Sequence, residues 1–136
     1  MTKTLTAEQL NPVQLSTCRP EVQAAIAAYV QQVVTNYADE VVSIILYGSQ
    51  ARGEADTESD IDLFIVVRHD TPSLRQDLAD LAWQVQFEHD VVISDIIRSL
   101  DEFTRMQAMQ FPYYQSLTRE GILLWKNPSA PTPGSA

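Results

Sequence analysis

Hydrophobic residues recur at steps of three and four along the stretch that begins at Pro20. This spacing is typical of one face of an amphipathic helix. Proline suits the first helical turn, because an N–H group there would have no partner within the helix. The pattern predicts a helix from Pro20 to about Tyr37, whose buried face consists of Val22, Ala25, Ile26, Tyr29, Val30, Val33, Val34 and Tyr37.

Four short hydrophobic runs have a different pattern. They occupy residues 41–47, 61–67, 90–97 and 122–125, and β-branched residues are frequent in them. Such runs are too short for buried helices and are typical of buried strands. The polar segment between the first two runs is short and contains two of the chain's four glycines. The first two strands are therefore expected to follow each other directly.

Further helices are predicted from capping signals. Thr71 and Pro72 match the N-cap and first position of a helix with a hydrophobic face. Ser99 with Glu102 forms a capping-box pattern, and residues 112–119 precede Gly121, a typical helix end. The resulting order is helix, strand, strand, helix, strand, helices. This order excludes a doubly wound sheet and predicts an α/β (α+β) fold, a small mixed β-sheet packed with helices.

The length of 136 residues fits one domain. Three parts are expected: an N-terminal arm at 1–19, a folded domain at 20–126, and a disordered tail at 127–136 that is rich in proline, serine and alanine. The only cysteine, Cys18, excludes an internal disulfide, and no cysteine–histidine pattern has zinc-site spacing. A reducing, cytoplasmic setting is the expectation.

Charge and hydropathy exclude some classes of partner. No hydrophobic run reaches the ~18 residues that span a bilayer, and the N-terminus lacks the layout of a signal peptide. The formal net charge of −9 disfavours DNA or RNA binding, because phosphates attract Lys and Arg. An acidic surface is compatible with a basic protein partner.

Two aspartates at the start of the second run are candidate metal ligands. Asp60 and Asp62 are separated by one residue, so a strand would place both side chains on one face, about 6.6 Å apart. The alternating residues Ile61, Leu63 and Ile65 would then face the core. A divalent cation would relieve the repulsion between the carboxylates, and Mg²⁺ prefers such oxygen ligands. The alternative is that both aspartates are solvated residues at a strand end.

Gly48 and Ser49 form a candidate phosphate site where the first strand ends. Glycine allows a sharp turn, and free backbone N–H groups with a serine hydroxyl bind anions. The alternative is an ordinary strand-to-helix turn. Neither a Walker loop nor a dinucleotide loop occurs in the chain. Beside a metal site, this turn would bind a nucleoside triphosphate with Mg²⁺.

The segment "YGSQARGEADTESDIDLFIVV" resembles the signature of the polymerase-β-like nucleotidyltransferases, especially the minimal nucleotidyltransferase branch. Its pattern is Gly48 and Ser49, then ten residues, then Asp60 and Asp62. The resemblance implies a polymerase-β-like fold and nucleotidyl transfer from ATP. Two Mg²⁺ ions held by the aspartates would assist the reaction. Gly48 and Ser49 would bind the β- and γ-phosphates, and Arg52 would neutralise the leaving pyrophosphate.

The resemblance also implies a third catalytic, metal-binding carboxylate on a later strand. Asp90 and Asp95 are the candidates in the third run. They are five residues apart, so an unbroken strand would place them on opposite faces and only one could join the site. Asp90 is preferred because it precedes a hydrophobic pair, as in the family motif. Asp95 is the alternative.

The resemblance also implies which molecule accepts the AMP group. Small members of the branch are paired with a HEPN-domain ribonuclease, which implies an antitoxin that transfers AMP to a tyrosine of this toxin in a hetero-oligomer with it. One alternative is an antitoxin that neutralises the toxin by binding alone. Another is a nucleotidyltransferase that acts on a small-molecule acceptor.

Overall fold

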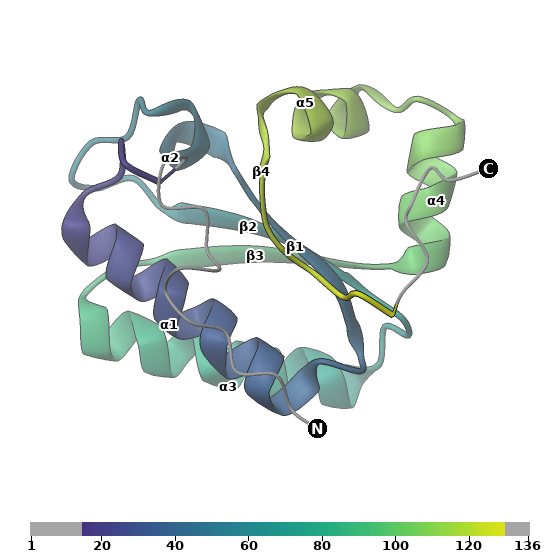
Figure 1. Ribbon diagram of the computed structural model, residues 1–136, viewed down its shortest axis with the longest axis horizontal. Coiled ribbons are helices and arrows are strands. Elements are labelled where there is room, and N and C mark those ends of the chain that lie inside the picture. Colours follow the sequence, from purple (N-terminus) through teal and green to yellow (C-terminus); the bar gives the residue numbers. More distant parts are fainter. Residues whose placement is uncertain (1–14, 130–136) are drawn as a thin grey trace.

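The computed structural model describes residues 15–129, and the remaining parts of the predicted arm and tail lie outside the described residues. The sheet has four strands in the order β3-β2-β1-β4 (Figure 1). The strands are β1 (Val41–Tyr47), β2 (Ile61–Val67), β3 (Ile93–Ser99) and β4 (Ile122–Lys126). β1 pairs antiparallel with β2 and β4, and β2 pairs parallel with β3. The prediction of a small mixed sheet is confirmed.

Within residues 15–129, five helices pack around the sheet. They are α1 (Pro20–Tyr37), α2 (Gly48–Arg52), α3 (Pro72–His89), α4 (Leu100–Ala108) and α5 (Pro112–Glu120). The predicted caps are confirmed, since the Thr71 hydroxyl accepts a hydrogen bond from the Leu74 N–H and the Ser99 hydroxyl accepts one from the Glu102 N–H. None of the described helices is long and apolar enough to cross a membrane.

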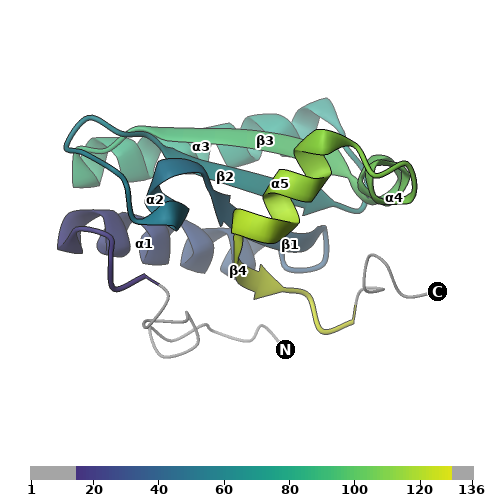
Figure 2. The same cartoon turned by 90° about the horizontal axis from the view of Figure 1, so that it is seen from above.

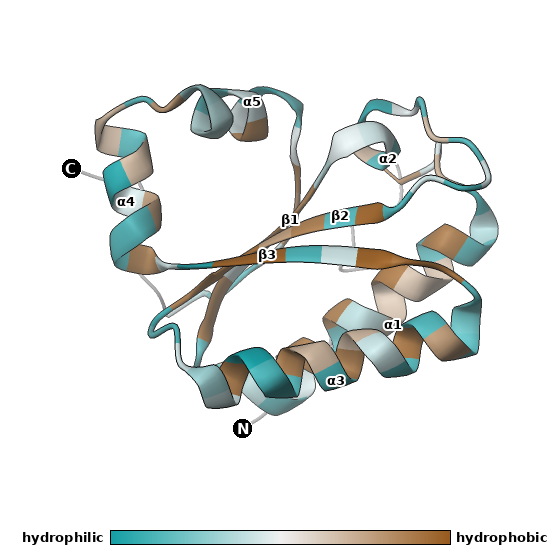
Figure 3. Cartoon of the chain, turned by 180° about the vertical axis from the view of Figure 1, so that it is seen from behind, coloured by the Kyte–Doolittle hydropathy of each residue, from teal (hydrophilic) through white to brown (hydrophobic). Residues whose placement is uncertain are grey.

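The two faces of the sheet have separate cores. α1 and α3 cover one face, and α5 lies across the other (Figure 2). The larger core packs Leu63 and Ile65 against α1 and α3, and the smaller one packs Phe64 and Val66 against α4 and α5. The strands are hydrophobic along most of their length, while the outer surfaces of the helices carry many hydrophilic residues (Figure 3). Alternation along β2 therefore assigns each side chain to a face.

Part of the stretch before α1 packs into the larger core. Leu15 and Cys18 are buried, and the Cys18 thiol donates a hydrogen bond of 3.6 Å to the Gln50 carbonyl. Burial raises the pKa of this thiol. The contact fixes the start of α1 against α2, next to the turn that carries Gly48 and Ser49.

Candidate active site

The turn between β1 and β2 is built around two glycines in the left-handed region. Gly48, with φ of 75°, starts the short helix α2, and Gly53, with φ of 72°, ends it. The Glu54 N–H closes the turn by donating a hydrogen bond of 3.0 Å to the Ser49 carbonyl. Ser49 lies in the first turn of this helix. The predicted sharp turn at Gly48 is confirmed.

Gly48 lies directly against Asp62. A Cβ atom at Gly48 would collide with the Asp62 carboxylate, Oδ2 being its nearest neighbour. Asp62 is also the register partner of Tyr47, the last residue of β1. The predicted phosphate turn and the second aspartate are therefore in van der Waals contact. No residue other than glycine leaves space for this approach.

Asp62 is half-buried. It lies two residues before Phe64 along β2, so its side chain is on the same face of the sheet, the face covered by α4 and α5. Asp60 precedes β2 and is exposed. Burial raises the pKa of the Asp62 carboxyl, the charge of Asp60 raises it further, and the charge of Arg52 opposes this shift. The fold thus holds two mutually repelling carboxylates together, an arrangement that a cation would stabilise.

The loop that leads to Asp60 is held by local hydrogen bonds. The Ser59 hydroxyl and the Glu58 N–H both donate to Asp56 Oδ1, at 3.1 and 2.9 Å. The pKa of the Asp56 carboxyl is lowered, first by the hydrogen bond from Glu58 and then by those from Ser59. The buried Gln50 side chain also donates to the Ser59 carbonyl, at 3.4 Å. These contacts limit the positions that Asp60 can adopt.

Arg52 ends α2 and makes two exposed ion pairs. Its Nε lies 3.0 Å from Glu54 Oε2 and its Nη1 lies 3.5 Å from Glu120 Oε2 on α5. The side chain is 38% exposed. The hydrogen bond to Glu54 is the first cause of a raised Arg52 pKa. The guanidinium is therefore permanently charged, and it is near enough to Asp62 to affect that carboxyl.

The prediction that residue 90 starts the third strand is wrong. α3 continues to His89, and Asp90 is its C-cap in the left-handed conformation, with φ of 53°. β3 starts only at Ile93. The helical period of α3 continues through residues 86–89, and the hydrophobic pair Val91 and Val92 belongs to the connection rather than to the strand. Asp90 is thus outside the sheet.

Asp95 lies on β3 but on the other face from Asp62. Its register partner is Leu63, while the partner of Asp62 is Ser94. Alternation places Asp95 with Ile93 and Ile97, which pack in the core beneath α1 and α3. Burial raises the pKa of the Asp95 carboxyl, and the charge of Arg75 on α3 opposes this shift. The described residues contain no group of three or more His, Cys, Asp or Glu that could hold a metal.

The model of the nucleotidyltransferase domain family matches residues 26–114, a range that spans the glycine turn, both aspartates and β3. The chain belongs to this nucleotidyltransferase family. A Methanocaldococcus jannaschii protein named as a candidate protein adenylyltransferase is 30% identical over 103 residues, which are 76% of this chain and 97% of that protein. The expectation of a nucleotidyltransferase enzyme is confirmed.

Solved structures share the fold. A chain in a toxin–antitoxin complex with AMP-PNP matches with a TM-score of 0.51 and 17% identity, covering 81% of this chain and 76% of that one. A mutant MntA–HpeT toxin–antitoxin structure matches with a TM-score of 0.52 and 15% identity, with the same coverage. At these identities the matches establish the fold alone. They agree with the polymerase-β-like fold that the signature implied.

The two aspartates of this nucleotidyltransferase fit a divalent cation in the chemistry of their donor atoms. Both supply carboxylate oxygens, and the charge of Asp60 already raises the pKa of Asp62. Mg²⁺ commonly binds through one or two carboxylates and keeps water and phosphate oxygens as its other ligands. In donor chemistry, Asp60 and Asp62 therefore fit the role of protein ligands to a magnesium–nucleotide complex.

Two residues that position this site were not predicted. Gln50 is buried and links α2 to the loop before Asp60, and Tyr47 lies beside both Gly48 and Asp62. Within the sequence, Gln50 has the pattern of any polar residue on a short helix. The tyrosine at the end of a hydrophobic run has the pattern of a core residue. Only the sheet register and the position of α2 show that Tyr47 and Gln50 differ from such ordinary residues and lie next to the site.

We expect Asp95→Asn to retain nucleotidyl transfer. Its gain in stability over wild type should increase as pH rises. The folded state raises the pKa of this carboxyl above its ordinary value, so stability falls as pH rises through the folded pKa. Asparagine does not ionise, and the variant should gain stability relative to wild type at pH 8 but little at pH 4. Urea unfolding at both pH values and a transfer assay would check this. Loss of transfer in a folded variant would contradict the assignment of Asp95 to the helix-covered face.

Proposed function

We propose that this nucleotidyltransferase transfers AMP from ATP to a hydroxyl group of a protein partner. The observation that carries the proposal is the contact between the Gly48 turn and the Asp62 carboxylate, with Asp60 and Arg52 nearby. The relative named as a candidate protein adenylyltransferase supports a protein acceptor. The fold shared with toxin–antitoxin complexes, one of them with AMP-PNP, supports an antitoxin role and an adenine nucleotide.

The partner that we propose is a HEPN-domain ribonuclease toxin, modified on a tyrosine and thereby inactivated. A ribonuclease must attract RNA phosphates and is expected to have a basic surface. The net charge of −9 on this chain is complementary to such a surface, and opposite charges accelerate association.

In the reaction, the acceptor hydroxyl attacks the α-phosphorus of ATP and pyrophosphate leaves. The N–H groups at the start of α2 and the Ser49 hydroxyl would bind the β- and γ-phosphates. Asp60 and Asp62 would hold Mg²⁺, which when bound neutralises phosphate charge. Arg52 would stabilise the charge that develops on the leaving pyrophosphate. The hydrogen-bonded β1–α2–β2 connection would orient these groups before the substrate binds, and such orientation lowers the barrier.

The test is incubation of the purified chain with Mg²⁺, α-labelled ATP and the candidate HEPN toxin, followed by intact mass measurement of both proteins. We expect one or more AMP units on the toxin and none when Asp60→Ala/Asp62→Ala replaces wild type. A double variant that binds the toxin and still silences it would contradict a catalytic antitoxin. Turnover of small acceptors with no transfer to protein would instead establish a small-molecule enzyme.

We expect Arg52→Ala to weaken transfer with little effect on stability. Both ion pairs of Arg52 are exposed, and exposed ion pairs contribute little to the free energy of unfolding. Loss of one hydrogen-bonding charge to the phosphates should lower kcat/KM for ATP by roughly 10- to 100-fold. Steady-state kinetics and urea unfolding would measure both. Arg68→Ala, on the connection after β2, is the matched control and should retain kcat/KM.

A further inference from the structure

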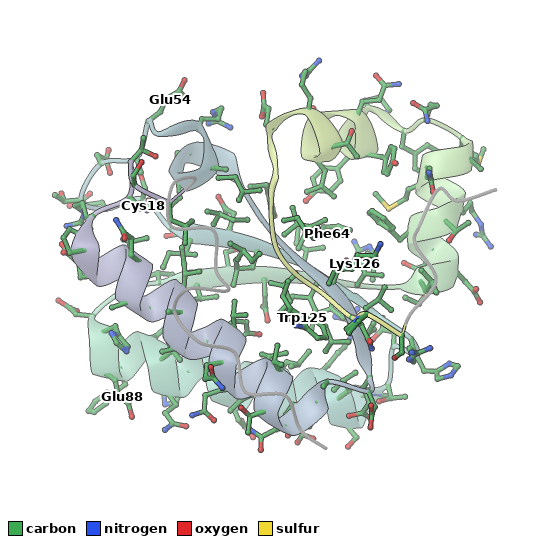
Figure 4. The ribbon with its side chains drawn as sticks, viewed as in Figure 1. Cys18, Glu54, Phe64, Glu88, Trp125 and Lys126 are labelled. Atoms are coloured by element: carbon green, nitrogen blue, oxygen red, sulfur yellow. The ribbon has the colours of Figure 1, made fainter. Side chains whose placement is uncertain are left out.

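Tyr113 in the first turn of α5 lies over the face of the sheet that carries Asp62. Its ring centroid is 6.0 Å from that of Tyr47 and 5.9 Å from that of Phe64. Phe64 points to the side of the sheet where α5 lies (Figure 4). Tyr47 is the register partner of Asp62, and Phe64 is the next residue along β2 on the same face. Tyr113 therefore covers the two strands next to the second aspartate.

The ring of Tyr113 packs against Tyr47, the register partner of this aspartate. The two rings meet edge to face, at an interplanar angle of 79°. Burial is the first cause of a raised Tyr47 pKa, and the charge of Asp62 contributes. Because Tyr47 immediately precedes Gly48 and pairs with Asp62, the Tyr113 ring packs on a direct neighbour of the residues to which we assign the phosphates and the cation.

Tyr113 also has access to solvent and to free volume. The residue is 41% exposed. A cavity of about 440 Å³ extends from it toward α4, lined by Phe64, Ile96, Arg98, Arg105, Met106 and Phe111 among others. A pocket of this volume is in the range that holds small ligands. A group attached to the Tyr113 hydroxyl would therefore have free volume beside the ring.

We propose that Tyr113 is an internal acceptor, so that without a partner the enzyme transfers AMP to its own Tyr113 hydroxyl. This inference rests on the proposed function, because it uses the same site, ATP and Mg²⁺. The phenolic oxygen forms a bond to the α-phosphorus, and the bond from the α-phosphorus to the oxygen bridging to the β-phosphorus breaks. Pyrophosphate leaves with that electron pair, the phenolic proton passes to water, and no group is oxidised or reduced.

The other described tyrosines are less suited as acceptors. Tyr114 is directed toward α4, with its ring 5.5 Å from that of Phe103. Tyr29 and Tyr37 belong to α1, on the opposite face of the sheet. Tyr47 is on the correct face, but the residue is half-buried and the Tyr113 ring of α5 packs against it. Tyr113 alone among them combines an exposed side chain with a position over the Asp62 face.

The experiment uses the full chain alone with ATP and Mg²⁺, followed by intact mass and peptide mapping. We expect one AMP unit, on the peptide that contains Tyr113. Tyr113→Phe keeps the ring packed on Phe64 and should lose the adduct, while the matched control Tyr114→Phe should keep it. Asp60→Ala/Asp62→Ala should form no adduct. Thermal unfolding of each variant would verify that it is folded. The fraction modified per unit time should not change on dilution, since the acceptor is intramolecular.

Parallel reactions with the candidate toxin separate the two proposals. An adduct on any other residue, or one that survives in folded Tyr113→Phe, would overturn the inference. Transfer to the toxin without any self-modification would also overturn it and would leave the proposed function intact. Transfer to neither protein would overturn both.

Discussion

Asp62→Asn is expected to reduce transfer by about 10³-fold while leaving the fold as stable as wild type or more stable. A bound cation contributes several kcal/mol of charge stabilisation in the transition state, and each 1.36 kcal/mol is tenfold in rate. Asparagine keeps the shape of the side chain but loses the charge that would hold Mg²⁺. The activity loss would therefore come from chemistry and not from unfolding.

The stability effect of this variant has a definite sign. Burial and Asp60 raise the folded pKa of Asp62 above its ordinary value. In the absence of metal, ionised Asp62 therefore lowers the free energy of unfolding, and this loss grows as pH rises through the folded pKa. Asparagine removes this loss of free energy. The variant should therefore be more stable than wild type at neutral pH, but only slightly more stable at a pH below the ordinary pKa of an aspartate.

Kinetics of transfer and urea unfolding in EDTA at pH 7 and at acid pH would measure both effects of Asp62→Asn. Asp80→Asn is the control, because Asp80 is exposed on α3, on the opposite side of the sheet. A folded Asp62→Asn protein with wild-type kcat/KM would remove Asp62 from the catalytic site. If Asp62→Asn were less stable than wild type at pH 7, this would contradict the inference that ionised Asp62 destabilises the folded state.

Gly48→Ala should abolish most activity and also destabilise the protein. Two penalties combine at this position. Alanine at φ of 75° costs about 1–2 kcal/mol in the left-handed region, and the new Cβ atom collides with the Asp62 carboxylate. The carboxylate or the turn must shift, and a displacement of about 1 Å at a catalytic group can cost 10²-fold in rate.

Gly53→Ala separates these two penalties. Gly53 has nearly the same φ, 72°, but a Cβ atom there would meet only the exposed Thr17 side chain, at 3.3 Å. This variant should lose about 1–2 kcal/mol of stability from the backbone alone and retain its kcat/KM. Urea unfolding and transfer kinetics of both variants make the comparison. Equal activity losses at the two positions would show that the backbone strain, and not contact with Asp62, decides the effect.

The sequence by itself located most of the elements and the signature residues of the proposed site. Helical and strand periods located α1, β1, β2 and β4 closely, because burial of one face imposes those periods. The capping residues Thr71 and Ser99 located the starts of α3 and α4. The signature of Gly48, Ser49, Asp60 and Asp62 is local, so its spacing was visible before the fold was known.

Only the tertiary structure decided the rest of the site. Whether residue 90 or 95 could join Asp62 depended on where α3 ends and on the register between β2 and β3. That register pairs Asp95 with Leu63, on the face that α1 and α3 cover, and pairs Ser94 with Asp62. The positions of Tyr47 and Tyr113 likewise follow from how α5 crosses the sheet. These relations join residues far apart in the chain, and the side-chain period of two means that a shift of one residue reverses the face.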